Sequence, residues 1–238
     1  MLRSAAIVAF VSAVAVTGVV VAAPVPPPSE KERLAKLWGK TEGQGEFELA
    51  GKQLTVRSTI GRPNRDFAWG QRPSAPRTKH VVSGDFEITV CVLEATAPNK
   101  DAKNDTGAAE TTAGLYIQGE ASIFRYSLGQ SYQQFPGAVN QNLQRSLRIE
   151  ASYPRGGAGG SSGVPENGKS TYVRLTRKGK EILMSHSSDG TKWSVPNNPF
   201  KNIDMGFPDE VTVGVFFAHS TYQFAHATFD GFTITKPK

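Results

Sequence analysis

The chain has 238 residues, of which 38% are hydrophobic and 20% charged. This length allows one domain with a substantial core, and all-β sandwiches of this size commonly remain a single domain. Lys and Arg outnumber Asp and Glu by 27 to 21, which gives a formal net charge of +6. The basic residues occur singly rather than in the clusters that follow phosphates, so the composition argues against nucleic acid as a partner.

Residues 1–23 have the composition of a secretory signal peptide. Arg3 supplies a positive charge, and the run 5–23 is apolar apart from two hydroxyl residues and a glycine. Cleavage after Ala22 fits the small residues that signal peptidase requires and keeps Pro24 away from the cleaved bond. The alternative is an uncleaved membrane anchor, because the run approaches the roughly 20 residues that span a bilayer. Both interpretations predict an exported protein, periplasmic or extracellular.

Residues 24–40 are expected to form a spacer and one short helix ahead of the main domain. The Pro-rich run 24–28 favours a stiff, extended spacer. Ser29 then precedes three charged residues in a pattern typical of a helix start, and Leu34 and Trp38 follow among apolar residues at helical spacing. We expect Trp38 to anchor this helix against the domain.

Residues 41–238 have the pattern of β-strands. Apolar and polar residues alternate in short segments, and turn compositions at 119–120 and 177–180 separate neighbouring segments. Such alternation is what two antiparallel sheets packed face to face require. We therefore predict an all-β, two-sheet antiparallel jelly-roll sandwich of ten or eleven short strands. The expected strands include 53–58, 85–93, 113–118, 122–128, 147–151, 172–176, 181–187, 211–217 and 229–234.

The core alone is expected to hold this fold together. Cys91 is the only cysteine, so no intramolecular disulfide can form, and its place in an apolar strand favours a small buried hydrophobe. The stretches 97–111 and 154–169 show no strand pattern and are longer than ordinary hairpin loops. Each is therefore interpreted as a ligand-side loop or a mobile loop.

Several short pieces of this domain follow one another in a familiar order. They are Phe47-Glu48-Leu49, Leu54-Thr55-Val56, Ala75-Pro76-Arg77, 82–87, 113–117, Arg177-Lys178-Gly179, 187–193, Val213-Gly214-Val215 and 227–232. In this order they resemble a bacterial family of domains of unknown function on the concanavalin A-like lectin/glucanase fold, a laminin-G-like jelly roll. The resemblance spans roughly 43–234. It implies a jelly-roll sandwich in an exported bacterial protein, often associated with carbohydrate, and it brings no agreed catalytic residues.

The strands lack the carboxylate arrangement that is typical of glycoside hydrolysis on this fold. Enzymes of this class that cleave β-glucans carry Glu-x-Asp-x-x-Glu or Glu-x-Asp-x-Glu on one strand, where two carboxylates flank the glycosidic bond. The nearest segment, Asp85 to Glu87, offers a single carboxylate on each face of its strand. A hydrolase would need a less familiar pair, such as Glu87 with Glu150. We therefore favour a protein that is not an enzyme.

No metal or cofactor is expected. His219 and His226 flank a turn and could face each other, but strand histidines beside solvent are commoner than metal ligands. Asp101, Asn104 and Asp105 could hold Ca²⁺ through oxygen ligands, yet they lack the glycine-punctuated spacing of a dedicated loop. A Ca²⁺ site is therefore an unsupported alternative.

The polar faces of the central strands are the candidate binding surface. On a curved sheet, side chains that alternate with the core residues could line a groove in which an aromatic ring stacks on sugar C–H groups while polar side chains bind hydroxyls. The alternative is a solvated face with cross-strand Arg–Glu pairs, each contributing about 0.2–1 kcal/mol. The candidate ligand-binding residues are Tyr116, Gln118, Arg148, Glu150, Tyr172 and Arg174.

These observations predict an exported, non-catalytic binding module for carbohydrate or glycan at the cell surface or in the periplasm. The alternative is a structural or protein-interaction domain of the cell envelope, tethered by the Pro-rich spacer. A glycoside hydrolase is the third hypothesis. The expected partner is a polysaccharide or glycan, or else another envelope protein. Membrane contact is expected only through an uncleaved N-terminal segment.

Overall fold

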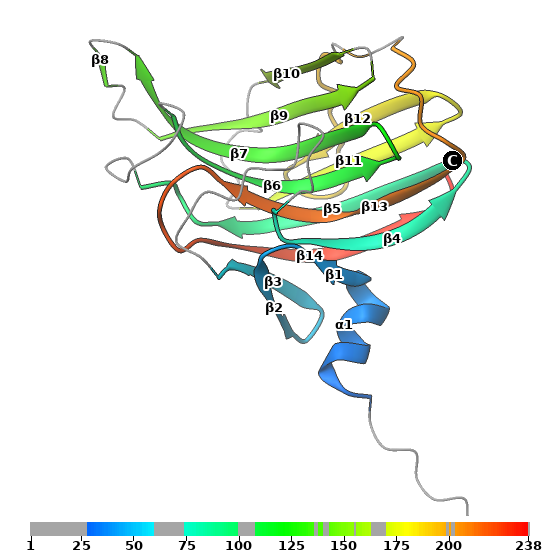
Figure 1. Cartoon of the computed structure of the whole chain (residues 1–238), viewed down its shortest axis with the longest axis horizontal. Coiled ribbons are helices and arrows are strands. Elements are labelled where there is room, and N and C mark those ends of the chain that lie inside the picture. Colours follow the sequence, from blue (N-terminus) through cyan, green and yellow to red (C-terminus); the bar gives the residue numbers. More distant parts are fainter. Residues whose placement is uncertain are drawn as a thin grey trace, which may run out of the picture.

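The computed structural model describes residues 28–59, 74–99, 108–135, 138–139, 143–154, 156–162, 170–198, 200 and 203–237. The segment 1–23 and the acidic cluster around Asp101 lie outside them. Within the described residues, no helix is long and apolar enough to cross a membrane. One helix and fourteen strands are described, and the strands form two sheets packed face to face (Figure 1).

Helix α1 (Glu30–Trp38) confirms the predicted short helix. It begins with a capping box, in which the Ser29 hydroxyl accepts the Glu32 N–H and the Glu32 carboxylate accepts the Ser29 N–H. Trp38 is only 1% exposed, and its ring stacks on the ring of Phe232 with 5.8 Å between centroids. Trp38 therefore anchors the helix on the sandwich, as expected.

The larger sheet has eight strands, in the order β1-β4-β13-β6-β7-β9-β10 with β8 paired to β7. All of its pairings are antiparallel. Its strands are β1 (Lys40–Glu42), β4 (Arg77–Ser83), β6 (Ala108–Gln118), β7 (Ile123–Phe135), β8 (Ala138–Val139), β9 (Gln144–Tyr153), β10 (Gly156–Ser162) and β13 (Glu210–His219).

The smaller sheet has six strands, in the order β12-β11-β5-β14-β3-β2, again all antiparallel. Its strands are β2 (Gly45–Ala50), β3 (Gln53–Ser58), β5 (Phe86–Ala95), β11 (Thr171–Lys178), β12 (Glu181–Ser187) and β14 (His226–Thr235). Together the two sheets confirm the predicted antiparallel jelly-roll sandwich.

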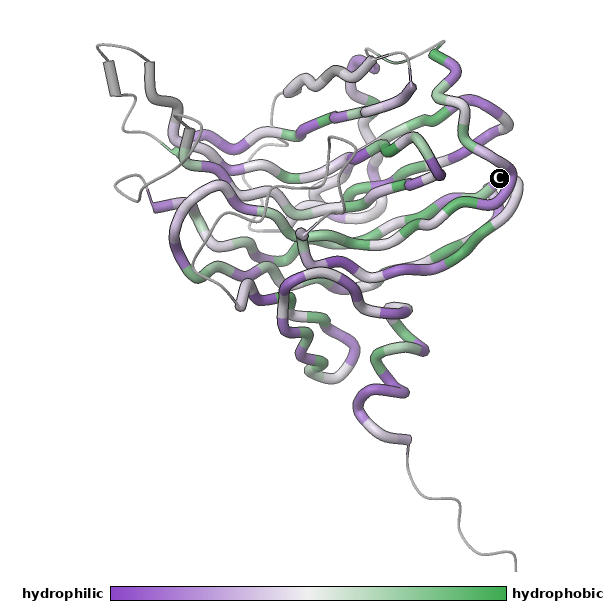
Figure 2. Tube along the Cα trace, in the orientation of Figure 1, coloured by the Kyte–Doolittle hydropathy of each residue, from purple (hydrophilic) through white to green (hydrophobic). Residues whose placement is uncertain are grey.

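The core lies between the two sheets and is built from the apolar face of each strand. Figure 2 shows hydrophobic and hydrophilic residues alternating along the strands. Leu115 and Phe124 of the eight-stranded sheet and Val90, Leu175 and Phe229 of the six-stranded sheet are fully buried in one cluster. Each such side chain contributes about 1.5–3 kcal/mol through the apolar area it removes from water. Cys91 is buried as predicted.

Five of the fourteen described strands (β1, β2, β4, β8 and β10) are absent from the expected ranges, and two of them, β4 and β10, show why. In β4, the side chains that alternate toward the core begin with Thr78 and His80, and these polar residues hide the pattern. The glycine-rich stretch 154–169 was predicted to be a loop, but its first half forms β10, which pairs with β9 as an antiparallel hairpin. The backbone hydrogen bonds of that hairpin need no apolar side chains, so no alternation marks it.

Candidate functional site

The outer face of the eight-stranded sheet, turned away from the core, carries four of the six candidate residues. Strand register places Gly214, Tyr116, Arg125 and Glu150 side by side in a row across β13, β6, β7 and β9. The neighbouring row consists of Val81, Thr212, Gln118, Ile123 and Ser152. Alternation along β6 and β9 therefore assigned the four candidate residues of this sheet to its correct side.

Tyr116 is a structural residue of this face rather than an exposed aromatic surface. Its side chain is 0% exposed, and its hydroxyl reaches from β6 to β4 to donate to the carbonyl of Thr78 at 2.7 Å. Gly214 lies on the strand between them, where a Cβ atom would overlap with that same carbonyl. Burial raises the pKa of Tyr116 well above its usual value, which keeps the hydroxyl protonated as the donor. The prediction that Tyr116 stacks on a sugar is therefore wrong.

Two ion pairs occupy the middle of the face. Arg125 is 5% exposed, and its Nη2 lies 2.7 Å from a carboxylate oxygen of Glu150. Arg148 Nη1 lies 2.6 Å from a carboxylate oxygen of Glu110, and its side chain occupies the space where a Cβ of Gly129 would project. Burial lowers the pKa of Arg125, against the opposing charge of Glu150. The alternative interpretation of Arg148 and Glu150, as members of cross-strand Arg–Glu pairs, fits this geometry.

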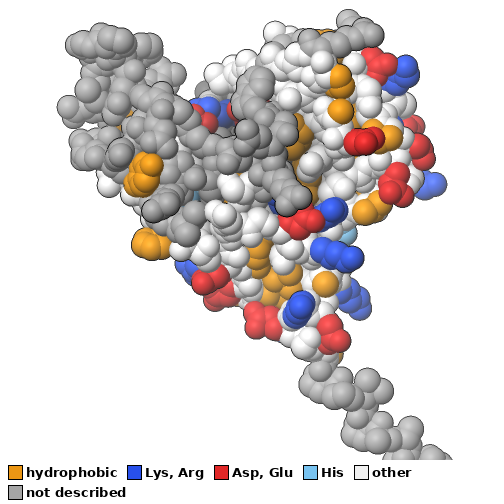
Figure 3. Space-filling model, viewed as in Figure 1, with side chains coloured by type: hydrophobic (Ala, Val, Ile, Leu, Met, Phe, Trp, Pro, Cys, Tyr) orange, Lys and Arg blue, Asp and Glu red, His pale blue; other side chains and the backbone are white. Residues whose placement is uncertain are grey.

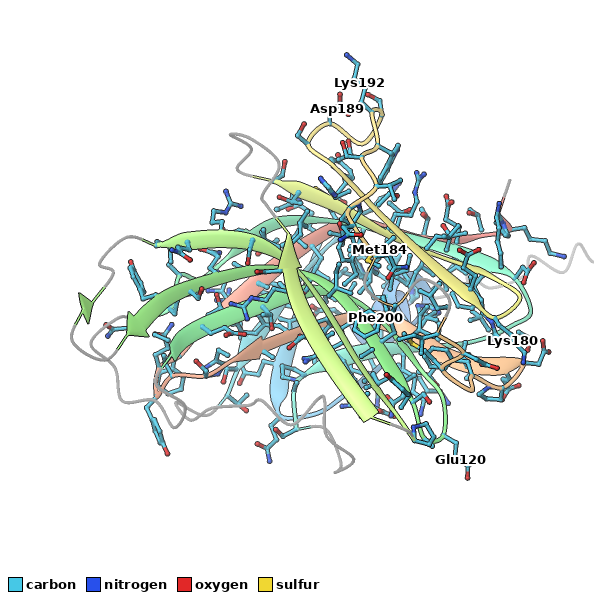
Figure 4. All side chains as sticks on the ribbon, turned by 90° about the horizontal axis from the view of Figure 1, so that it is seen from above. Glu120, Lys180, Met184, Asp189, Lys192 and Phe200 are labelled. Atoms are coloured by element: carbon cyan, nitrogen blue, oxygen red, sulfur yellow. The ribbon has the colours of Figure 1, made fainter. Side chains whose placement is uncertain are left out.

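An open pocket of about 370 Å³ lies at one end of this face. Its lining residues on β13 and β6, which we call the floor, come between two other groups in the sheet. Those on β1 and β4 form what we call one wall, and those on the β6–β7 turn and the segment 208–210 the other. We call it the β4–β6 pocket. Its lining residues are Glu42, Arg77, Lys79, Val81, Gln118, Gly119, Glu120, Pro208, Glu210, Val211 and Thr212. Figure 4 shows Glu120 at the tip of the β6–β7 hairpin.

The walls of the pocket are fixed by local contacts. The Gly119 N–H donates to the Ser122 carbonyl at 2.8 Å and closes the β6–β7 turn. A Cβ at Gly119 would meet Pro208 at 3.0 Å, so the turn and the opposite segment are in close contact. On the other wall, Glu42 binds Arg77 at 2.7 Å and Lys79 at 3.1 Å. Partial burial opposes ionisation of Glu42, but the hydrogen bond from Lys79 and the charge of Arg77 hold its pKa below the usual value.

Tyr172 and Arg174 lie on the other sheet, on the outer face of β11. The Arg174 guanidinium lies 3.5 Å from the centre of the Trp193 ring, and its Nε approaches Thr89 Oγ1 at 3.3 Å. The ring of Tyr172 lies so close to Gly190 that a Cβ there would meet it at 3.1 Å. Both side chains therefore hold the loop after β12 against β11, a loop whose tip carries Asp189 and Lys192 in Figure 4.

The six candidate residues consequently do not form one groove. Tyr116 is enclosed, Arg148 and Glu150 are ion-paired, and Tyr172 and Arg174 face away on the opposite sheet. Gln118 lines the β4–β6 pocket. The catalytic alternative that paired Glu87 with Glu150 also fails, because these carboxylates lie on the outer faces of different sheets.

The two histidines of the metal hypothesis have separate partners. The buried His219 ring contacts the Thr221 carbonyl at 2.9 Å and the Ser58 hydroxyl at 3.0 Å. The His226 ring contacts the Thr96 hydroxyl at 2.9 Å. Among the residues that the structure describes, no three His, Cys, Asp or Glu side chains are grouped so that they could hold a metal ion.

Most of the pocket could not be found from the sequence. Lys79 and Val81 belong to β4, which has no apolar alternation, and Glu42 belongs to a strand of only three residues. Thr212 alternates with Val211 and Val213, so its outward direction was readable. Its place beside Gln118 depends on the pairing of β13 with β6, which are almost one hundred residues apart in the chain.

Comparisons with known proteins agree with this fold. No family model and no curated protein match the sequence. Among solved structures, a functionally unknown protein from Saccharomyces cerevisiae matches with a TM-score of 0.57 and 14% identity, over 82% of this chain and 97% of that chain. The CBM2 module of Lactobacillus casei BL23 phage J-1 evolved Dit matches at 0.48, with 10% identity over 82% of each chain.

An alginate lyase from Klebsiella pneumoniae matches at a TM-score of 0.45, with 10% identity over 80% of this chain and 84% of that chain. The likeness to the yeast protein concerns the fold alone, which in this chain is a two-sheet antiparallel jelly roll. The scores below 0.5 give no support for a shared activity.

Proposed function

We propose that the protein is a non-catalytic binding module that holds part of a carbohydrate chain in the β4–β6 pocket. The pocket itself is the observation that carries this proposal. It combines the Gln118 amide and the Thr212 hydroxyl with the charged groups of Lys79 and Glu210, beside the exposed apolar surface of Val81. Sugar hydroxyls both donate and accept hydrogen bonds, and ring C–H groups pack on apolar side chains, so the lining suits a glycan.

The expected affinity for a single sugar is low. Three or four hydrogen bonds at about 1 kcal/mol each give about 3–4 kcal/mol, or a Kd on the order of 1 mM. Among the described residues, those that line the pocket include no aromatic side chain to add stacking. Useful binding therefore needs a longer chain or several copies of the module, and assays must tolerate weak binding.

The carboxylates do not favour hydrolysis. Glu110 and Glu150 each pair with an arginine, and a general acid for glycoside cleavage needs burial in an apolar site to stay protonated. Glu120 and Glu210 are both exposed to solvent. Binding without cleavage is the function that fits these positions.

A glycan array probed with the protein in a multivalent form, which the low expected affinity requires, tests the proposal. The purified protein should bind at least one glycan reproducibly, with and without Ca²⁺, and release no cleaved product. The double variant Gln118→Ala, Thr212→Ala should lose this binding at unchanged thermal stability. The matched control is Gln53→Ala, Thr55→Ala, which changes the same residue types on β3 of the other sheet and should bind normally.

A blank array from folded protein would overturn the proposal. The next hypothesis would then be a protein partner, tested by pull-down from the cell envelope. Loss of binding in the β3 control but not in the pocket variant would place the ligand on the six-stranded sheet instead.

We further propose that the protein works outside the cytoplasm. Arg3 and the apolar run 5–23 support this proposal. Mass spectrometry of the protein recovered from the cell should show a mature N-terminus at residue 23 or 24, in the periplasmic or secreted fraction. A full-length chain in the cytoplasmic fraction would refute export, whereas a full-length chain in the membrane fraction would identify an anchor.

A further inference from the structure

The β4–β6 pocket distributes its charges unevenly. Glu42 is neutralised on one wall, where it binds both Arg77 and Lys79. Glu120 on the β6–β7 turn and Glu210 at the start of β13 are exposed, and neither makes an ion pair within the described part of the chain. The cations of the pocket are therefore already engaged, while two of its carboxylates are free to bind a ligand.

The net charge of the pocket lining is opposite in sign to the net charge of the whole chain. The three glutamates of the lining exceed Arg77 and Lys79 by one charge, whereas the chain carries a formal net charge of +6. Figure 3 shows acidic and basic side chains intermixed on the visible described surface rather than separated into large fields of one sign. The acidic excess of the pocket is thus a local feature that favours a cationic group on the ligand.

That cationic group is organic rather than a metal ion. The pocket carboxylates belong to no metal-holding group of three among the residues that the structure describes. The lining also includes Pro208 and the side chain of Val81, a residue that is 59% exposed, and a bare ion would leave these apolar groups unused. A cation attached to a carbon skeleton would contact both the carboxylates and the apolar wall.

We propose that the ligand of the β4–β6 pocket is a glycan with free, protonated amino groups, that is, a chain of de-N-acetylated hexosamine. This inference rests on the proposed carbohydrate-binding function and names its ligand class. The ammonium group binds Glu120 and Glu210, while Gln118 and Thr212 bind ring hydroxyls. A uronic acid chain would instead bring its carboxylates against those two glutamates, which repel it.

Two ligands of equal length test this inference. Isothermal titration calorimetry at about pH 6, where a sugar amine is protonated, compares a β-1,4-linked glucosamine tetramer with its fully N-acetylated counterpart. The glucosamine tetramer should bind at least about tenfold more tightly, which corresponds to about 1.4 kcal/mol. The difference should shrink as salt is added.

Charge-neutralising variants test whether the preference for the glucosamine tetramer depends on the two pocket glutamates. The double variant Glu120→Gln, Glu210→Gln should lose the preference for the glucosamine tetramer. The matched control, Glu46→Gln, Glu181→Gln, removes the same charge from exposed positions on the six-stranded sheet and should keep the preference.

The possible outcomes distinguish a failure of the amine inference from a failure of the proposed carbohydrate-binding function. Equal binding of both tetramers, or tighter binding of the acetylated one, would overturn the amine inference and leave carbohydrate binding intact. Binding of a lysine tetrapeptide as tightly as the glucosamine tetramer would also overturn it, because charge alone would then select the ligand. Failure of both tetramers together with a blank glycan array would overturn the proposed function as well.

Discussion

The hydroxyl of Tyr116 offers a sharp test of how the outer face of the eight-stranded sheet is built. Replacing Tyr116 by Phe keeps the ring but removes the donor of the 2.7 Å hydrogen bond to the Thr78 carbonyl. Thr78 is 0% exposed, so its carbonyl would lose that partner in a buried site. Leaving a buried acceptor unsatisfied costs about 1–3 kcal/mol. In a domain of this size, that cost lowers Tm by roughly 2–4 °C for each kcal/mol.

Thermal and denaturant unfolding of Tyr116→Phe measure this cost directly. The matched control is Tyr153→Phe, which changes a half-buried tyrosine whose hydroxyl makes no hydrogen bond with a described residue, and which should shift stability by less than about 0.5 kcal/mol. Glycan binding by Tyr116→Phe should be unchanged. An unaltered Tm for this variant, or a loss of binding at full stability, would refute the structural role given to Tyr116.

Three further results are expected. Gly214→Ala places a Cβ against the Thr78 carbonyl and should cost about 1–3 kcal/mol in chemical denaturation, so a neutral result would contradict the close approach of β13 and β4. Glu150→Gln leaves the buried Arg125 guanidinium without its carboxylate and should cost roughly 1–3 kcal/mol, less than a fully buried pair because the Glu150 side chain is 30% exposed. Burial lowers the pKa of His219 below its usual value of 6.5, so stability should be full above about pH 6.5 and fall as the pH drops below it. Tm measured against pH should show this slope, and His219→Gln should reduce it; an equal slope in both proteins would show that His219 is not responsible.

Local patterns were sufficient to predict the helix and most strands. The capping box at Ser29 and the apolar spacing up to Trp38 are signals within one short, continuous stretch of chain. Leu115 and Ile117 alternate with polar neighbours because β6 has a core face and an outer face. Strand β4 was not predicted because its inward positions begin with Thr78 and His80, which are polar. The Thr78 hydroxyl accepts its hydrogen bond from the Val215 N–H only once the sheet is assembled.

The candidate site was less predictable, because alternation states which residues share a side of one strand and not which sheet the strand joins. Tyr172 and Tyr116 looked equivalent in the sequence. Strand pairing places Tyr172 on the six-stranded sheet, where its ring lies beside Gly190. It places Tyr116 on the eight-stranded sheet, where its hydroxyl donates a hydrogen bond to the Thr78 carbonyl. The neighbourhood of Gln118 and Thr212, which forms the floor of the pocket, likewise depends on contacts between strands distant in the chain.

Chemical-shift mapping by NMR tests the central claim, that the β4–β6 pocket binds a glycan, most directly. The backbone amides of the protein are followed while an array-positive glycan is added, at concentrations that reach the expected millimolar range. We expect shift changes centred on Val81, Gln118 and Thr212, absent from the Gln118→Ala, Thr212→Ala variant. Changes centred on Trp193 and Arg174 of the opposite face, or no changes at saturating glycan, would contradict this claim.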